Sequence, residues 1–336
     1  MRLEEVSGED WDRHVGAFRD AVHEQTHAYA AARWGRRQVR CFIASEDGAA
    51  VGGALVMTIG LPMTRCGIAT VKFGPLHRPV GRETRAGAMG RIAAALRAHF
   101  CEALNYRLTI IPPPGEEAPV AELAAAGYHP ERPLADRRRY LIDLSLPLEA
   151  LRAGTKTRWR RNLKHAEGQG LDIGEVAGRQ GLEIFNGVFD SLAGRKQGVD
   201  RAGLREMADL MQAADPRLRP RIYLARRRHY PVAGAIVSTI GERATYLFGA
   251  QTEAGHQMCA SYGLQMHIIA ALGTEGRCRW YDLGGDNNVA GLIQFKTGLI
   301  GEHGRIVTIP APMSASGGLL SDLLATAGKA ARSLVR

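Results

Sequence analysis

The sequence predicts an α/β protein of two tandem domains, each a mixed sheet flanked by helices. Segments with helical periodicity alternate with short strand-like segments along the whole chain. The order of these segments in the first 145 residues recurs in the rest, without obvious sequence identity, which indicates a structural duplication. The length of 336 residues suits two hydrophobic cores of ordinary size.

The first half is predicted to follow the order helix, hairpin, strand, helix, strand, helix, strand. These elements are expected at residues 11–35, 39–45 with 49–59, 70–75, 83–104, 106–111, 120–126 and 139–144. Glu46-Asp47-Gly48 supplies the hairpin turn, three prolines from Pro112 stop the strand before them, and Gly127 caps the short helix. The last strand is expected to close the first sheet.

The second half repeats this order after a boundary near Ser145. Its elements are expected at 148–169, 171–176, 182–192, 201–213, 221–225 with 232–240, 244–249, 261–273, 280–283, 292–298 and 305–309. The predicted domains are therefore 1–145 and 146–312, followed by an amphipathic tail over 313–336. Leucines at 319, 320, 323 and 324 lie opposite Lys329 and Arg332 in that tail. We expect the tail to pack on the protein body, and peripheral contact with a membrane through 317–336 is the alternative.

Composition favours a globular protein without a metal. No apolar run is long enough to cross a bilayer, and the N-terminus has no apolar signal segment, so we expect a cytoplasmic location, with the inner face of the membrane as the alternative. The five cysteines form no C-x-x-C pair and the eleven histidines show no ligand spacing. The net charge of +10 indicates an acidic partner, although an arginine-rich composition is also typical of GC-rich genomes. Only six of the 44 basic residues are lysines, so a retained lysine hints that a compact ammonium is needed.

Several nucleotide-binding and hydrolase motifs are absent, including the P-loop, the dinucleotide fingerprint and G-x-S-x-G. The order of the elements suggests the N-acetyltransferase (GNAT) superfamily, whose members bind acetyl-CoA through a glycine-rich turn of the type Q/R-x-x-G-x-G/A. No stretch has that spacing, so no cofactor is expected.

Four sequence blocks carry a more specific resemblance. They begin at Thr245 (Thr-Tyr-Leu-Phe-Gly-Ala-Gln), Gln265 (Gln-Met-His-Ile-Ile), Tyr281 (Tyr-Asp-Leu-Gly-Gly-Asp) and Gly291 (Gly-Leu-Ile-Gln-Phe-Lys-Thr-Gly-Leu-Ile-Gly-Glu). Their order resembles the second domain of the FemABX aminoacyltransferases, with Y-L-F-G, a long helix, Y-D-[FL]-G-G and F-K-x-G. The stretches from Lys156 and Arg195 also resemble that family, and those from Gln25 and Lys72 match it more loosely. The resemblance to the FemABX family covers most of residues 20–310.

The resemblance implies two tandem GNAT-like domains and transfer of an aminoacyl group from aminoacyl-tRNA to a free amine of a peptidoglycan precursor. Aminoacyl-tRNA would be a co-substrate, and a phosphorylated cell-wall precursor would be the other partner. An acyl-CoA- or carrier-dependent N-acyltransferase is the second hypothesis. A degenerate fold that acts as a nucleic-acid or membrane-surface adaptor is the third.

Candidate site residues follow from this resemblance and from the chemistry of acyl transfer. Attack of an amine on an ester builds negative charge on the carbonyl oxygen, which a fixed cation stabilises, and Lys296 is the candidate. Phe295 would exclude water, and Asp282 would either accept a proton or form a turn. The candidates for substrate binding are Lys72, Arg158, Arg161 and Arg195, which would hold phosphates or be merely solvated, and Tyr246 and Tyr262, which would line the site or the core. Residues 200–220 leave no room for the long helical arm of many FemABX proteins, and Gly298-Leu-Ile-Gly replaces G-F-G-G, so the substrate stays open.

Overall fold

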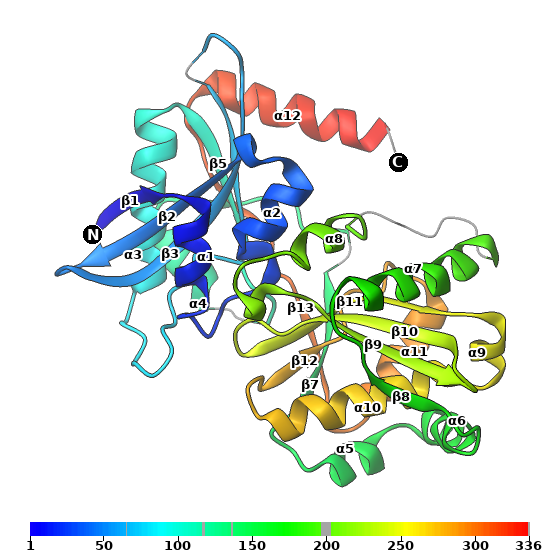
Figure 1. Ribbon diagram of the computed structural model, residues 1–336. Coiled ribbons are helices and arrows are strands. Elements are labelled where there is room, and N and C mark those ends of the chain that lie inside the picture. Colours follow the sequence, from blue (N-terminus) through cyan, green and yellow to red (C-terminus); the bar gives the residue numbers. More distant parts are fainter. Residues whose placement is uncertain (65, 116–117, 136, 196–202, 335–336) are drawn as a thin grey trace. The chain divides into compact units, whose positions relative to one another are not determined.

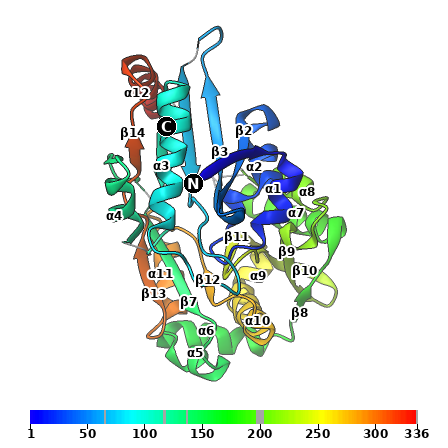
Figure 2. The same ribbon diagram turned by 90° about the vertical axis from the view of Figure 1, so that its left-hand side faces the viewer.

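The structure is a computed structural model that describes residues 1–64, 66–115, 118–135, 137–195 and 203–334, except the side chains of Arg195 and of 328–334. The chain divides into two compact units, Met1–Arg137 with Thr308–Arg336, and Arg138–Val307. Within the described residues each unit contains a seven-stranded mixed sheet with helices on its faces (Figures 1 and 2). The predicted fold class is confirmed.

The first unit has the strand order β1-β2-β3-β4-β5-β14-β6, in which only β4 and β5 are parallel neighbours. Its elements are β1 (Arg2–Val6), α1 (Gly8–Val15), α2 (His27–Trp34), β2 (Val39–Glu46), β3 (Ala49–Gly60), β4 (Gly67–Lys72), α3 (Ala88–Arg97), β5 (Tyr106–Ile111), α4 (Ala118–Ala125), β6 (His129–Pro130), β14 (Met313–Ala315) and α12 (Leu319–Leu334). Adjacent glycines of β3 show how the sheet is covered. A Cβ at Gly52 would lie 2.4 Å from Ile92 of α3, and one at Gly53 would lie 2.6 Å from Trp11 of α1. Because successive side chains point to opposite faces, α3 and α1 cover opposite faces.

The second unit has the strand order β13-β7-β12-β11-β10-β9-β8. Its elements are β7 (Arg138–Asp143), α5 (Leu148–Gly154), α6 (Thr157–Glu167), β8 (Asp172–Glu175), α7 (Gly178–Arg195), α8 (Glu206–Leu210), β9 (Arg221–Arg227), β10 (Tyr230–Ser238), β11 (Arg243–Gln251), α9 (Glu253–Gln257), α10 (Ala260–Glu275), β12 (Trp280–Asp282), α11 (Ala290–Ile300) and β13 (Arg305–Thr308). Short 3₁₀ or π-helical segments complete the chain at His23–Gln25, Arg36–Gln38, Ala98–Ala103 and Pro216–Leu218. Helices α10, α6 and α11 share one hydrophobic core with the central strands.

Strand β7 corrects the sequence-based assignment of the sheets. Residues 139–144 were expected to close the first sheet, but β7 lies in the second sheet, where it pairs antiparallel with β12. The side chains of Tyr140 and Ile142 are buried in the core of the second unit. Strand β14, which the expected tail 313–336 contains, lies in the first sheet between β5 and β6. The two units therefore differ in extent from the expected ranges 1–145, 146–312 and 313–336.

Two predicted long helices are each divided in the structure. The helix expected over 148–169 breaks between α5 and α6 at Thr155, whose backbone is extended. The break is stabilised by tertiary hydrogen bonds, because Gly154 O accepts from the amide of Glu302 (3.0 Å) and the amide of Lys156 donates to Gly298 O (3.0 Å). These bonds fix the start of α6 to the C-terminal end of α11. The helix expected over 11–35 becomes α1 and α2, because Thr26 caps α2 with its side chain.

Candidate active site

The central parallel strands of the second sheet separate at their carboxyl ends. Strands β11 and β12 pair only over 243–245 and 280–282. Beyond that point β11 has a β-bulge, because Val237 of β10 faces Tyr246 whereas its neighbour Ile236 faces Phe248. The extra residue bends β11 at the level where β12 ends. The loop after β12 therefore occupies space beside the main chain of Tyr246, whose carbonyl oxygen would lie 3.5 Å from a Cβ at Gly284.

The loop after β12 begins with a tight turn made by Asp282. The buried carboxylate of Asp282 accepts a hydrogen bond from the amide of Gly284 (2.8 Å), and its other oxygen lies 3.8 Å from the guanidinium of Arg243. Gly284 has a φ of +75°, a left-handed conformation that favours glycine. Of the two roles considered for Asp282, the geometry supports the turn-forming one, since the carboxylate is already engaged by the backbone.

Asp286 is the residue that anchors this loop, and the sequence reasoning missed it. Its fully buried carboxylate accepts hydrogen bonds from the Tyr140 hydroxyl (2.6 Å), the Asn288 amide (2.8 Å) and the Arg138 guanidinium (2.9 Å). Burial alone would raise the pKa of Asp286, but these three donors outweigh it and hold the pKa below its ordinary value. The pKa of Tyr140 is raised by burial and by the neighbouring carboxylate. An acidic residue directly after Gly284-Gly285 was the available signal.

Helix α11 returns the chain to the same loop and delivers Lys296 to it. The predicted turn of helix over 292–298 is a helix of 11 residues, Ala290–Ile300, and Lys296 is only 6% exposed. Its ammonium donates a hydrogen bond to the carbonyl oxygen of Gly285. A Cβ at Gly284 would lie 3.8 Å from the Lys296 ammonium and 3.5 Å from the Arg139 guanidinium. The Tyr-Asp-Leu-Gly-Gly and Phe-Lys motifs thus form one structural unit, in which a fixed cation lies against a glycine turn.

Phe295 belongs to an aromatic cluster beside the lysine. Its ring centroid lies 5.0 Å from that of Tyr262 and 6.1 Å from that of Trp159, and Trp159 and Tyr262 are themselves 5.0 Å apart. The cluster joins α6, α10 and α11 and packs against the core of the unit. Phe295 and Tyr262 therefore contribute apolar surface next to the helix that carries Lys296. Both are partly buried, which suits a wall of the site as well as a core position.

Tyr246 lies on β11 in a buried polar network with α10. The Tyr281 hydroxyl donates to the side-chain oxygen of Gln265 (2.9 Å), and both residues are buried. Burial raises the pKa of Tyr246 to about 12, against the opposing effect of a hydrogen bond with Gln265. Gly249 is required beside it, since a Cβ there would lie 1.5 Å from the Tyr246 hydroxyl oxygen. Gln265 was quoted only as part of a motif, and its role in holding two tyrosines was not predicted.

The predicted phosphate-binding arginines lie apart from this buried centre. Arg158 and Arg161 are both exposed on α6, one on each side of buried Trp159 in the sequence. Both side chains can meet a ligand from solvent. Arg195 is the last residue of α7, and its side chain lies outside the described part of the chain.

Lys72 belongs to the first unit and there faces two residues that the sequence reasoning passed over. Its ammonium lies 3.2 Å from the carboxylate of Glu24 and 5.1 Å from the ring centroid of Phe73. The imidazole of His23 lies 3.0 Å from the same carboxylate, and His23 and Glu24 are both only 8% exposed. The neighbouring Gln25 fixes this group, because its side chain bonds the amide of Leu55 (3.0 Å) and the carbonyl oxygen of Lys72 (2.8 Å).

One cavity of the second unit lies away from the lysine. It has a volume of about 360 Å³ and is lined mainly by aliphatic side chains of α6, α10 and β8, among them Leu163, Ile173 and Met266, together with His267. Lys296, Asp282 and Asp286 are not among its lining residues. We therefore place the candidate active site at the loop and not in this cavity.

Comparisons with known proteins agree with the fold that the motifs suggested. Residues 153–297 match the family model described as an acetyltransferase (GNAT) domain. The span lies wholly within the second unit and ends one residue after Lys296. No curated protein matches the sequence.

Solved structures extend the similarity to the whole chain. The crystal structure of FemX superposes with a TM-score of 0.76 at 14% sequence identity, covering 96% of this chain and 98% of that one. The C-terminal domain (DUF2156) of a protein of Agrobacterium fabrum assigned as a lysylphosphatidylglycerol synthetase superposes with a TM-score of 0.58 at 16% sequence identity. The match covers 95% of this chain and 94% of that one. L-PGS from Bacillus licheniformis superposes with a TM-score of 0.53 at 13% sequence identity, covering 84% of this chain and 85% of that one.

These similarities identify the fold class of the chain and its place within that class. Its fold is that of a tandem GNAT protein, in which two acetyltransferase-like units follow one another. Within that class it has the FemX-like arrangement, as the sequence motifs predicted. The family match and the fold together support an N-acyltransferase or aminoacyltransferase.

Proposed function

We propose that the protein transfers an aminoacyl group from aminoacyl-tRNA to a free amine of a peptidoglycan precursor or a related cell-envelope acceptor. The observation that carries this proposal is the buried Lys296, whose ammonium lies against the Gly284-Gly285 turn. A buried ammonium that the backbone holds in one position beside a glycine turn favours a chemical role. In such a reaction the protein would work in the cytoplasm, where charged tRNA is made.

The proposed chemistry needs only a fixed cation and a dry surface. The acceptor nitrogen bonds to the ester carbon of the donor, and the carbonyl oxygen becomes an oxyanion, which Lys296 stabilises. The tetrahedral intermediate then collapses, the ester C–O bond breaks, and the ribose hydroxyl leaves with a proton that originates from the amine. Phe295 and Tyr262 would keep water from the ester. The turn held by Asp282 and Asp286 keeps the ammonium in place before the reaction begins.

The names of the structural neighbours support an acceptor in the cell envelope. FemX and a protein assigned as a lysylphosphatidylglycerol synthetase have this fold, and the FemABX resemblance implies aminoacyl-tRNA as the donor. Lys72, Arg158, Arg161 and Arg195 are proposed to bind phosphates of the donor or the acceptor. Tyr246 is proposed to line the acyl site through its β11 position.

Acyl-CoA-dependent N-acylation is the second candidate, and the GNAT family match favours it. A pyrophosphate binds through backbone N–H groups at a helix N-terminus, and the segment between β11 and α10 leads into the long helix α10. That segment contains the short helix α9, whose first turn carries Glu253, and it has no glycine-rich turn. A carboxylate there opposes a pyrophosphate, which is why we place aminoacyl-tRNA first.

A donor competition experiment tests the proposal. The full chain is incubated with a mixed pool of radiolabelled aminoacyl-tRNAs and an amine-bearing muropeptide precursor, and in parallel with labelled acetyl-CoA. We expect label transfer from tRNA only, and a loss of about 10²-fold or more in kcat for Lys296→Ala. Arg179→Ala is the matched control, because it removes a cation whose side chain is 82% exposed on α7.

Each outcome decides one part of the proposal. Transfer from acetyl-CoA without transfer from tRNA would show that the donor is wrong and that the CoA alternative holds. Full activity of Lys296→Ala would show that the oxyanion is stabilised elsewhere, even with the donor confirmed. An equal loss of activity in Arg179→Ala would show that the assay responds to the loss of any cation.

A further inference from the structure

Arg139 brings a second cation to the glycine turn that holds Lys296. A Cβ at Gly284 would lie 3.5 Å from the Nη1 atom of Arg139 and 3.8 Å from the Nζ atom of Lys296, so both charged groups approach one point. Arg139 is partly exposed, whereas Lys296 is only 6% exposed. The arginine can therefore meet a ligand from solvent at the place where the lysine is fixed.

The pairing of β7 with β12 places Arg139 at this turn. The amide of Leu283 donates to the carbonyl oxygen of Tyr140 (2.9 Å), which continues the antiparallel pairing past the end of β12. The next residues along the two strands are Gly284 and Arg139, so they lie opposite each other. Because successive side chains of a strand point to opposite faces, Arg139 points away from the face in which Tyr140 is buried.

The charged side chains placed at this loop include more cations than carboxylates. The carboxylates of Asp282 and Asp286 each accept a hydrogen bond from a backbone amide of the loop. The cations beside them are those of Arg138, Arg139, Arg243 and Lys296. An excess of positive charge at one place attracts an anion from solution.

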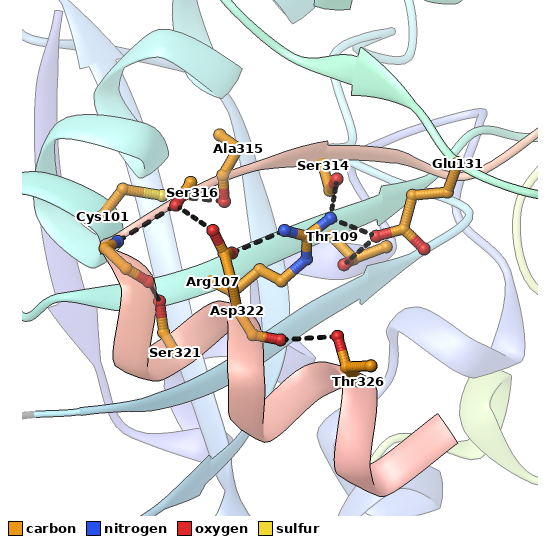
Figure 3. A network of polar contacts seen from close by, with 11 residues as sticks. Cys101, Arg107, Thr109, Glu131, Ser314, Ala315, Ser316, Ser321, Asp322 and Thr326 are labelled. Carbon is orange, nitrogen blue, oxygen red and sulfur yellow. Dashed lines mark hydrogen bonds and ion pairs between the residues drawn. The ribbon is translucent and has the colours of Figure 1, made fainter. Parts of the chain in front are cut away.

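Arg107 of the first unit shows how this fold holds an arginine that has a structural role. Its guanidinium donates to the carboxylates of Asp322 (2.6 Å) and Glu131 (3.0 Å) and to the hydroxyl of Ser314 (2.7 Å), as Figure 3 shows. Two carboxylates thus flank one guanidinium. At the glycine turn, in contrast, two cations flank one stretch of backbone, which is typical of a place that receives an anion.

The donor of the proposed reaction carries such an anion next to the reacting ester. This step rests on the proposed function, in which the acyl group is esterified to the terminal ribose of tRNA. The charged group closest to that ester is the phosphate on the 5′ carbon of the same ribose. A guanidinium binds two phosphate oxygens through parallel N–H groups, whereas an ammonium acts as a point charge. The arginine therefore suits the phosphate, and the lysine suits the single oxyanion.

We propose that Arg139 determines donor specificity by binding the 5′-phosphate of the aminoacylated nucleotide. With the phosphate held by Arg139, the ester carbonyl is oriented toward the ammonium of Lys296. Arg139 transfers no proton and forms no bond to the acyl group. Its role is to bind one end of the donor and thereby to position the other.

A pair of minimal donors tests the proposal on the full chain. Aminoacyl adenosine 5′-monophosphate is compared with aminoacyl adenosine, each carrying on its ribose the amino acid that the protein transfers from the tRNA pool. We expect the unmodified protein to prefer the phosphorylated donor by about 10–100-fold in kcat/KM. Arg139→Gln should use the two donors equally, with kcat/KM for aminoacyl adenosine unchanged within about twofold. Arg139→Lys keeps the charge and should retain part of the preference.

Arg107→Gln is the matched control, because it removes a guanidinium whose side chain is 21% exposed and whose partners are known. The carboxylates of Asp322 and Glu131 lose their common partner, so the free energy of unfolding measured in urea should fall. The preference for the phosphorylated donor should equal that of the unmodified protein. The control thus separates a loss of stability from a loss of phosphate binding.

Several outcomes would overturn the inference while aminoacyl transfer itself stands. Equal use of the two donors by the unmodified protein would show that the phosphate is not recognised. An unchanged preference in Arg139→Gln would assign the phosphate to another group, and an equal loss with both donors would leave Arg139 a structural role only. Transfer from acetyl-CoA and from no aminoacyl ester would refute the proposed function, and this inference with it.

Discussion

Asp286→Ala is expected to open the loop that positions Lys296. The alanine leaves the buried Tyr140 hydroxyl and the Asn288 amide without the acceptor to which they donate at 2.6 and 2.8 Å. It also removes one of the partners of Arg138, whose side chain is 38% exposed and also donates to Asn288. This loop carries Gly285, whose carbonyl oxygen accepts a hydrogen bond from the Lys296 ammonium. Opening of the loop should therefore displace the acceptor that positions the candidate catalytic lysine.

The size of the effect follows from the three donors. A hydrogen bond to a charged group contributes about 1.5–3 kcal/mol, and of the three donors only Tyr140 is buried, since Asn288 is exposed. The contact with Arg138 is discounted because water screens it. We therefore expect a loss of about 2–4 kcal/mol in the free energy of opening the loop. Tyr140→Phe alone should cost about 1.5–2 kcal/mol, and because the two residues share one bond, the double variant should cost less than the sum.

Native-state hydrogen exchange of the peptides that cover 282–296, read by mass spectrometry, measures this free energy locally. The work is done at pH 7, where the contribution of Asp286 is fully present. Its folded pKa is lowered from 3.8, so the stabilisation persists above pH 3.8 and is lost only as the pH falls below it. The control Asp209→Ala removes an exposed carboxylate of α8 in the same unit. Strict additivity of Asp286→Ala and Tyr140→Phe would refute the reasoning, as would a loss below about 1 kcal/mol.

Three further predictions concern the same unit. Gly301→Ala should destabilise the protein by at least about 3 kcal/mol in urea unfolding, because its Cβ would lie 2.0 Å from the carbonyl oxygen of Gly154. The control Gly276→Ala, also at positive φ but in open space, should cost about 1–2 kcal/mol. Equal costs of the two substitutions would contradict the steric argument. Lys296→Arg keeps the charge but offers a planar group at the glycine turn. It should lower kcat by about 10²-fold with little change in KM for the donor. A kcat equal to that of the unmodified protein would show that any cation suffices at this position. Burial raises the pKa of Tyr246 to about 12, so the unfolded chain loses its proton first as the pH rises above 10. The free energy of unfolding should therefore fall by about 1.4 kcal/mol per pH unit between pH 10 and 12. This fall should be less steep in Tyr246→Phe. A tyrosinate absorbance titration that gives Tyr246 an ordinary pKa would contradict the prediction.

The motif-bearing part of the fold was predictable because its local signals agree. The long helix α10, the short strand β12 and the glycine pair after it all come from patterns of a few residues. The loop anchor at Asp286 was not predictable in this way, because its three donors come from Tyr140, Arg138 and Asn288, two of them on β7. A side chain that bonds residues nearly 150 positions away leaves no periodic trace in the sequence.

The same limit applies to the residues around Lys72. The sequence singled out the lysine as one of six, but not Glu24 and His23, which face it across the first unit. Both residues fall inside the helix expected over 11–35, whereas the structure places them in a short 3₁₀ segment and buries both. The fixed geometry comes from Gln25, whose amide bonds two separate strands. Only tertiary structure could reveal that arrangement.

The strand order explains why the domain boundary looked simple in the sequence and is not. In the second sheet β7 follows β12, the later member of the parallel pair, and in the first sheet β14 follows β5 in the same way. The two sheets are thus completed by equivalent strands, each from the end of the other half of the chain. A repeat of elements in sequence shows that two sheets exist, but it cannot show which half completes which sheet, because both strands are short. For the site this matters directly, since β7 brings Tyr140 and Arg138 to Asp286. The candidate catalytic loop is therefore fixed by residues that precede the expected boundary at 145.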